Sequence, residues 1–484
     1  MAKTNSGLLN NFGWKFMERI LAQAVSLVVS IILARLLSPE DYGQVSIVLV
    51  FITVANVFVS DGFGAALIQK KNSDALDFCS VLYFNIVFSI LLYLLIYFLA
   101  PLFANFFNST QEFVLIIRVL GLRIVITGVN SVQHAYVSKK MIFRKFFWST
   151  LFGTVVSAIV GITLAYLGLG VWALVAQYLT NTFIDTVVLA IVLNKRPRFI
   201  FSFARLKSLV GFGSKVLGTN LMITGFSEIR TILIGRVYSS ADLAYYDRGQ
   251  HFPKLIITNV NTSVSSVLFP KMANEQDDKK RVKDIARKSI RFSTYVMAPM
   301  MFGLAIVAEP FVKVILTDKW LACVPFLQLA CIMYLFYPIH TTNMQIIKAL
   351  GKGKLYLGIE IIKKTIELIV LFICVWISIE WVMIGSTILA TLFTVVNAFP
   401  NKKLVDYSFK EQIIDIMSPF VMSFVMVGVV YLISLIQLPV IWSLIIRVCI
   451  GAITYVLLSF ITKNKEFGYI INLIKSKVKR RKEV

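Results

Sequence analysis

Long apolar segments alternate with short polar connections along the whole chain. Two examples are LAQAVSLVVSIILA, which begins at Leu21, and VLYFNIVFSILLYLLIYFLA, which begins at Val81. An apolar run of about 18 or more residues is long enough to cross the hydrocarbon core of a bilayer as an α-helix. The pattern therefore predicts an all-α, polytopic membrane protein.

The apolar segments predict about fourteen transmembrane helices, joined by short connections. The longest polar connection is expected between Lys271 and Arg291. The expected helices cover residues 14–36, 44–69, 79–104, 112–138, 146–168, 171–194, 208–235, 243–270, 289–315, 323–349, 355–379, 381–400, 412–437 and 440–462.

Basic residues are concentrated in the connections that follow even-numbered segments and in the C-terminal tail. The chain has 49 Lys and Arg against 25 Asp and Glu, a net charge of +24, yet only 15% of its residues are charged. Because connections rich in Lys and Arg stay in the cytoplasm, both termini are expected there, in a bacterial inner membrane. Arginine-rich arms interleaved with aromatic residues are missing, so nucleic acid is not an expected partner.

The first and seventh segments are similar in sequence. FGWK (Phe12–Lys15) matches FGSK (Phe212–Lys215), and ARLLSPED (Ala34–Asp41) matches GRVYSSAD (Gly235–Asp242). The offset of six segments predicts a parallel repeat of two six-helix lobes around a central cavity. We expect lobes at residues 1–200 and 201–400, and two extra helices with a basic tail at 401–484.

Charged side chains also occur inside the apolar segments, at spacings that place them on one helix face. A charge that faces lipid at mid-membrane costs at least about 2.5 kcal/mol, which favours a shared polar cavity. Structural pairing, as between Glu228 and Arg230, is the alternative. The candidate substrate-binding residues are Lys15, Arg19, Arg123, His134, Lys215, Arg230, His251 and Lys254.

Three acidic residues in these segments are candidates for coupling transport to protons or sodium. They are Asp61, Glu228 and Asp247. For Asp61, a structural role within the second segment is equally compatible with the sequence.

Signatures of metal binding and catalysis are missing from the sequence. The five cysteines are scattered, and the three histidines fit no metal-ligand spacing. GKGK at Gly351–Lys354 lacks the spacing of a nucleotide-binding loop. The connections opposite the basic ones are too short for the acid pairs of a glycan-modifying enzyme. We therefore expect no enzyme, no cofactor and no metal.

Several motifs together carry a family resemblance. They are ARLLSPEDYGQ (Ala34–Gln44), DGFGAALIQKK (Asp61–Lys71), LYFNIVFS (Leu82–Ser89), LFPKMANEQDD (Leu268–Asp278) and KWLACVPFLQLACI (Lys319–Ile332). The chain resembles the polysaccharide-transport, Wzx-type flippase branch of the multidrug/oligosaccharidyl-lipid/polysaccharide exporter superfamily. It is most similar there to exporters of colanic and teichuronic acid.

The resemblance implies two lobes whose central cavity opens to one side of the membrane at a time. It implies that a polyprenyl-diphosphate-linked oligosaccharide moves from the cytoplasmic to the outer leaflet. Lys15 and Arg19 are the family-like candidates for holding the diphosphate, and Lys215 is their repeat counterpart. Membrane lipids are the other expected partners, with a polysaccharide polymerase and glycosyltransferases as candidate protein partners.

Two related functions remain open as alternatives. A multidrug exporter of the same superfamily would be expected to have an acidic or aromatic cavity, whereas the segments here contain more Lys and Arg than Asp and Glu. A flippase for another lipid-linked precursor, such as that of peptidoglycan, is poorly separated by sequence alone.

Overall fold

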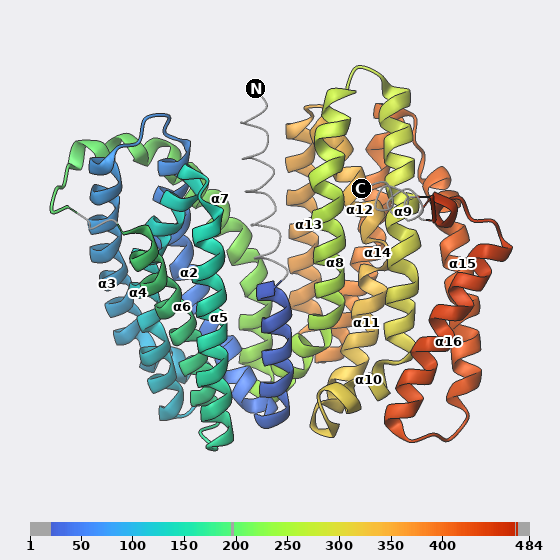
Figure 1. The fold of residues 1–484 in the computed structure, drawn as a ribbon, viewed down its shortest axis with the longest axis horizontal. Helices are drawn as coiled ribbons and strands as arrows, with labels where there is room; N and C mark the ends of the chain where they lie inside the picture. Colours follow the sequence, from blue (N-terminus) through green and yellow to red (C-terminus); the bar gives the residue numbers. More distant parts are fainter. Residues whose placement is uncertain (1–20, 195–197, 470, 473–484) are drawn as a thin grey trace, which may run out of the picture. The chain divides into compact units, whose positions relative to one another are not determined.

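The protein folds almost entirely into long α-helices. The computed structural model describes residues 21–194, 198–469 and 471–472, and the helices divide into two compact units between Ala244 and Tyr245 (Figure 1). In the part that the structure describes, no residue is in a β-strand. The all-α fold expected from the sequence is confirmed.

Unit 1 is built around α2, which contacts α3, α4, α6 and α7. A helix at Leu21–Leu36 precedes it. The remaining bounds are α2 Pro39–Gln69, α3 Ala75–Phe106, α4 Gln111–Lys140, α5 Phe143–Tyr166, α6 Val171–Leu193 and α7 Phe203–Val237.

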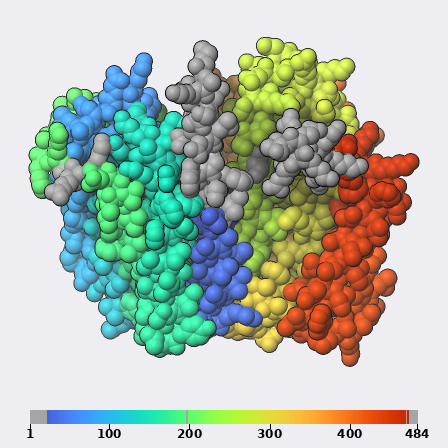
Figure 2. Space-filling model, in the orientation of Figure 1, coloured from blue at the N-terminus to red at the C-terminus, as the bar shows by residue number. Residues whose placement is uncertain are grey.

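Unit 2 is built around α9, which contacts α11, α12 and α15. Helices α15 and α16 lie together at one edge of this unit (Figure 2). The bounds are α8 Ser240–Asn274, α9 Lys279–Ile306, α10 Ala308–Ile315, the 3₁₀ helix η1 Asp318–Cys323, α11 Val324–Leu335, α12 Tyr337–Ala349, α13 Gly353–Cys374, α14 Ile379–Val405, α15 Phe409–Ser434 and α16 Val440–Ile461.

Each of the fourteen expected membrane segments corresponds to helical structure. Nine helical stretches of the described chain are long and apolar enough to span a bilayer. Helices α4, α7, α8 and α13 are of similar length but are not among these nine, and the described part of the first segment is shorter. The division of the chain at residues 200 and 400 stays a prediction.

Two details of the expected segments are wrong. The expected polar connection between Lys271 and Arg291 is mostly helix, because α8 continues to Asn274 and α9 begins at Lys279 (Figure 1). Leu268 and Met272 on α8 pack with buried apolar residues of α9, which extends both helices beyond their apolar cores. The expected segment 289–315 is also not one helix, since α9 ends at Ile306 and α10 begins at Ala308.

The sequence repeat is visible as two equivalent helix starts. At the start of α2, the Asp41 backbone N–H donates to Ser38 Oγ (3.2 Å), and the Ser38 N–H donates to the Asp41 carboxylate (2.9 Å). At the start of α8, Ser239 and Asp242 exchange the same two bonds at 3.2 and 3.1 Å. These reciprocal bonds form a capping box, which satisfies N–H groups that a helix start leaves unpaired.

Glycines set the close packing of α7 and of the first residue of α8 on α2. A Cβ at Gly213 of α7 would lie 3.0 Å from the carbonyl oxygen of Gly62 on α2. A Cβ at Gly43 would lie only 1.8 Å from the carbonyl oxygen of Ser240. Side chains at these positions would separate the elements, so glycine allows the approach that brings α7 residues to the polar face of α2.

A network of charges joins α15 to α9 in unit 2. Asp415, whose side chain is fully buried, accepts bonds from Arg287 (Nε to Oδ2, 2.8 Å) and Arg291 (Nε to Oδ1, 2.9 Å). The Tyr407 hydroxyl also donates to Asp415 (2.7 Å). Burial and this bond raise the pKa of Tyr407, so the phenol stays protonated as a donor.

Candidate functional site

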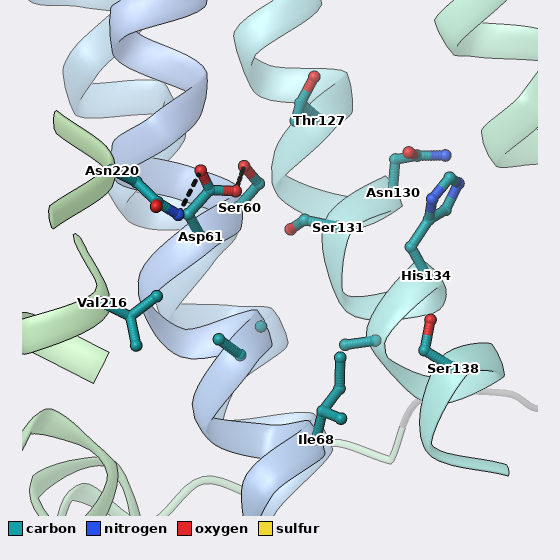
Figure 3. A pocket seen from close by; sticks show the side chains of 13 residues that line it. Ser60, Asp61, Ile68, Thr127, Asn130, Ser131, His134, Ser138, Val216 and Asn220 are labelled. Carbon is teal, nitrogen blue, oxygen red and sulfur yellow. Dashed lines mark hydrogen bonds between the residues drawn. The ribbon is translucent and has the colours of Figure 1, made fainter. Parts of the chain in front are cut away.

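Unit 1 contains a polar cavity between α2, α4 and α7 (Figure 3). Its volume is about 370 Å³. It reaches Ile68 and Ser138, which lie in the last turns of α2 and α4, next to a basic connection. Its lining comprises Ser60, Asp61, Gly64, Ala65, Ile68, Thr127, Asn130, Ser131, His134, Ala135, Ser138, Val216 and Asn220.

The α2 side of the cavity carries Asp61 between two donors. Asn220 on α7 donates its amide to Asp61 Oδ2 at 3.1 Å, and Ser60 Oγ donates to Oδ1 at 2.8 Å (Figure 3). Asn220 is brought there by the contact between Gly62 and Gly213 two turns away. Asp61, predicted to couple ions, therefore lies in a cavity, but it is also held by local bonds.

The α4 side of the cavity carries Asn130 and His134, which share one acceptor on α6. Asn130 Nδ2 donates to Asp185 Oδ2 at 2.8 Å, and His134 Nε2 lies 2.8 Å from the same oxygen. The Phe146 ring on α5 packs edge-on against the imidazole, with ring centres 4.7 Å apart. The predicted stripe on α4 therefore meets α6 rather than lipid.

Helix α4 is held in position on its other side by α3. A Cβ at Gly128 would lie 2.5 Å from Ser89 Oγ, so only glycine fits this contact. Asn85, 1% exposed, donates to Ser131 Oγ (3.2 Å) and to the carbonyl of Val59 on α2 (3.0 Å). These bonds join α2, α3 and α4 behind the cavity and fix the polar face of α4.

Arg123 continues the polar stripe of α4 three turns from His134. Its Nε donates to Thr182 Oγ1 on α6 at 2.9 Å, and the guanidinium carbon lies 5.5 Å from the centre of the Tyr178 ring. A hydroxyl and an aromatic face hold the cation without neutralising it, so Arg123 keeps its positive charge inside the helix bundle.

The other predicted residues of unit 1 lie elsewhere. Lys215 is exposed on α7, about one turn from Asn220. Glu228 and Arg230 are half-buried further along α7, and each has an interaction partner. Lys15 and Arg19 lie outside the described residues.

The remaining predicted residues belong to α8. His251 is half-buried and meets the Phe252 ring edge-on, with ring centres 5.5 Å apart. Lys254 is exposed, and Asp247 is half-buried with an interaction partner. Their roles in binding and coupling stay predictions.

Asp185 is the residue that the sequence reasoning missed. It is a single carboxylate within an otherwise apolar helix, in LTNTFIDTVVLAIVL. Asn181 precedes it by one turn and bonds Ser157 on α5 at 3.3 Å. An acid inside an apolar segment needs a partner. This criterion, which singles out Glu228, also identifies Asp185.

The cavity is chemically suited to protons and small polar groups. Its described lining offers hydroxyls, amides, one carboxylate and one imidazole. Arg123, which could bind an anion, lies outside this lining on the same face of α4. That the lysines and arginines of several helices face one shared cavity stays a prediction.

Long apolar helices in two units, together with ionisable groups that face an intramembrane cavity, define a polytopic membrane transport protein. The chain belongs to the family described as "Polysaccharide biosynthesis protein", whose sequence model matches residues 32–325.

Three curated relatives are named for the biosynthesis or transport of bacterial polysaccharides. The succinoglycan biosynthesis transport protein ExoT of Rhizobium meliloti is 26% identical over 71% of this chain and 69% of its own. The teichuronic acid biosynthesis protein TuaB of Bacillus subtilis is 24% identical over 62% of each chain. The lipopolysaccharide biosynthesis protein WzxC of Escherichia coli is 22% identical over 66% and 65%, respectively.

Solved structures share the fold. The lipid II flippase MurJ in its inward closed conformation superimposes with a TM-score of 0.74, at 18% identity, over 94% of this chain and 98% of its own. An inward-facing multidrug resistance transporter of the MATE family gives 0.61, at 16% identity, over 80% and 96%. The family resemblance expected from the sequence is confirmed.

Proposed function

We propose that this protein is a flippase that moves a polyprenyl-diphosphate-linked oligosaccharide from the cytoplasmic to the outer leaflet by alternating access. The observation that carries this proposal is the family match across residues 32–325. The relatives are named for three different polysaccharides, succinoglycan, teichuronic acid and lipopolysaccharide, so the proposal specifies the lipid carrier rather than one sugar.

The physical problem for such a protein is the diphosphate, which carries about two negative charges. Guanidinium and ammonium groups replace its water with charge-assisted hydrogen bonds. Arg123 supports this role because its partners in unit 1, Thr182 and Tyr178, leave it positively charged. Arg19 and Lys15, in the first predicted segment, are proposed to act with it.

The membrane potential favours the proposed direction. One elementary charge that crosses the membrane gains about 2.3 kcal/mol per 100 mV, so a dianion gains about twice that when it leaves an inside-negative cell. A proton or sodium ion that binds acidic residues such as Asp61 would add to this drive.

Both termini are proposed to be cytoplasmic, in a bacterial inner membrane. The Lys and Arg excess of the connections after α2, α4 and α8 supports this orientation. The lipid-linked glycan is then taken up at the basic end of the helices, where glycosyltransferases build it, and it is released to a polymerase outside.

The test replaces Arg19 and Arg123 together by glutamine. Proteoliposomes would contain a polyprenyl-diphosphate oligosaccharide with a fluorophore on the glycan, and the rate of transfer would be read from dithionite quenching. Each lost charge-assisted bond is worth about 1.5–3 kcal/mol, so the rate should fall by about tenfold or more.

The matched control is Arg281→Gln, which removes a charge of the same kind from an exposed side chain on α9. It should transfer the lipid at the wild-type rate. Wild-type transfer by a folded Arg19→Gln/Arg123→Gln variant would contradict cationic binding of the diphosphate. Transfer at the protein-free rate by the unmodified protein would contradict the function itself.

A further inference from the structure

A histidine and an aspartate form a pair where α4 meets α6. His134 Nε2 lies 2.8 Å from Asp185 Oδ2, an oxygen that also accepts a bond from Asn130. Among the described residues, the other carboxylate oxygen, Oδ1, is buried without a hydrogen-bond partner. A cation beside the carboxylate is therefore strongly favoured, because a buried charge without compensation is costly.

The two members of the pair differ in their access to water. The His134 side chain is 33% exposed and lines the cavity, whereas the Asp185 side chain is 13% exposed and lies behind it. Figure 3 shows His134 on the cavity-lining stretch of α4, between Asn130 and Ser138, with its imidazole on the side of the helix away from Asp61 and Asn220. A proton that enters the cavity thus reaches the imidazole first, while the carboxylate stabilises it from the protein side.

We propose that the His134–Asp185 pair is a proton-binding site of unit 1. With a proton bound, the imidazolium donates a charge-assisted hydrogen bond to Asp185 and holds α4 to α6. When the proton leaves, a neutral imidazole faces the carboxylate, and the link between the two helices weakens. The proton enters and leaves through the cavity, and no other bond is made or broken.

The charged groups around the pair are consistent with reversible binding. Asp61 faces the same cavity from α2, and Arg123 lies three turns away on α4. On α5, Phe146 packs on the imidazole, and Lys145 is bound to the carbonyl of Val192. Further charges on α4 and α5 are Lys139 and Lys140 at the end of α4, Glu112 and Arg118 near its start, and Arg144 on α5. The other charges of α2 and α3 lie at helix ends, as Glu40, Asp41 and Asp77, and α3 contributes the uncharged Asn85 through Ser131.

The geometry favours a proton over a metal cation. A sodium or other hard cation needs several free oxygen ligands, whereas Asp185 Oδ2 already accepts bonds from an amide and an imidazole N–H. A proton needs only one nitrogen lone pair, and imidazole is the side chain that exchanges its proton between pH 5 and 8.

The pair would couple proton movement to the proposed transport, and this step rests on the proposed function. In such coupling, binding of a proton to His134 strengthens the contact between α4 and α6, and its release weakens that contact. The Arg123–Thr182 bond joins the same two helices, so the proton site and the proposed phosphate ligand share one helix interface.

The experiment measures the histidines directly, because the chain has only three. The full-length protein would be labelled with ¹⁵N-histidine and placed in lipid nanodiscs. Its spectra would be recorded from pH 5 to 9, with His134→Gln to assign the signal. We expect the His134 imidazole to gain and lose a proton reversibly in this range. Asp185→Asn should alter this response to pH, because the imidazolium loses its counter-ion.

Glu309→Gln is the matched control, because it removes a carboxylate that pairs with Lys313 at the surface of unit 2. It should leave the His134 signal unchanged. A His134 signal that is constant across this pH range, or that responds equally in Asp185→Asn and wild type, would overturn the proposal. So would a His134 signal that responds to sodium at constant pH rather than to protons.

A second measurement separates this proposal from the proposed function. A pH gradient should change the rate of glycan-lipid transfer in wild-type proteoliposomes and have no effect with His134→Gln. Proton binding without any lipid transfer would support the site and contradict the flippase. Transfer that is equally sensitive to the gradient in both proteins would contradict the coupling.

Discussion

At the scale of single residues, two buried carboxylates of the described chain, Asp77 and Asp415, are held by cations from outside their own helices. Asp77 on α3 has a fully buried side chain and lies 2.7 Å from Lys70 Nζ at the end of α2. Asp415 on α15 is bound by two arginines of α9. Such pairs specify which helices associate, because each partner is costly to leave alone in the interior.

Asp415→Asn should destabilise unit 2. Arg287 and Arg291 would lose the negative charge that compensates them, and each is about one-third exposed. We expect a loss of about 2 kcal/mol in the free energy of unfolding, below the 3–5 kcal/mol found for fully buried pairs. Denaturant titration in detergent measures it. In the control Glu309→Gln, which removes an exposed ion pair, the free energy of unfolding should change by about 0.5 kcal/mol or less.

Thr317→Gly should stabilise the protein. Thr317, between α10 and η1, has φ 85° and ψ 169°, a region that glycine occupies freely and a β-branched residue rarely adopts. Removing the side chain should raise the free energy of unfolding by about 1 kcal/mol. Asn108→Gly is the control, since Asn108 has φ 50° and asparagine tolerates that conformation. An equal gain at both positions would show that backbone strain at Thr317 is not the cause.

The sequence could reveal which residues are unusual, but not what they bind. Asp61 and His134 were recognised as polar residues within apolar helices, and both line the cavity. The partner Asp185 lies 51 residues from His134 in the chain, and Arg287 lies 128 residues from Asp415. These pairings depend on how the helices pack, and a single sequence contains the period of a helix but not its neighbours.

At the scale of the helix, α2 organises unit 1 through its glycines. Gly43 contacts Ser240 at the start of α8, and Gly62 contacts α7. Close approach of two backbones increases the number of van der Waals contacts between helices, which is a main source of stability in a membrane. The polar face of α2 is positioned for Asn220 by these contacts.

Gly43→Ala should weaken this contact. Its new methyl group would overlap the carbonyl oxygen of Ser240, a backbone atom that cannot rotate away. We expect the free energy of unfolding to fall by about 2 kcal/mol or more. The control on the same helix is Gly64→Ala, where no atom lies within 4 Å and stability should be unchanged or rise by up to about 1 kcal/mol. Equal stability of the two variants would argue against the contact.

The helices could be predicted from hydrophobicity, but their ends and interruptions could not. The expected helix at 323–349 is divided at Phe336 into α11 and α12, and Pro338 stands in the first turn of α12. Proline is favoured in the first turn because it has no N–H to leave unpaired. The polar extension of α9 was missed because its stabilising contacts come from α8 and α15 rather than from lipid.

At the scale of the whole molecule, lysine and arginine concentrate in the connections after α2, α4 and α8, which form the basic end of each unit. Several of these residues also bind the carbonyls that terminate helices: Lys139 binds those of Ile68 and Lys70 on α2, and Lys145 binds that of Val192 on α6. The last carbonyls of a helix have no partner within it and attract cations. The same basic residues therefore favour the predicted orientation of the protein in the membrane and stabilise the ends of its helices.

The predicted orientation can be tested with two cysteines in otherwise similar positions. Gln276 lies in the turn between α8 and α9, at the basic end, and Gln437 lies between α15 and α16; both are exposed. A membrane-impermeant maleimide added to intact spheroplasts should label Gln437→Cys and leave Gln276→Cys unlabelled. After the membrane is opened, both should react. Labelling of Gln276→Cys in intact spheroplasts would reverse the proposed topology.

The charge network between α9 and α15 has an evolutionary consequence. Arg287 and Arg291 lie on α9, within the predicted lobe 201–400, whereas their counter-ion Asp415 lies on α15, in the predicted extra pair of helices. If the pair was added to a twelve-helix ancestor, we expect the two arginines to have been acquired together with Asp415. Shorter homologues that end after the helix equivalent to α14 should have uncharged residues in place of both arginines. In homologues that contain the equivalents of α15 and α16, substitutions of the two arginines and of the aspartate should occur together.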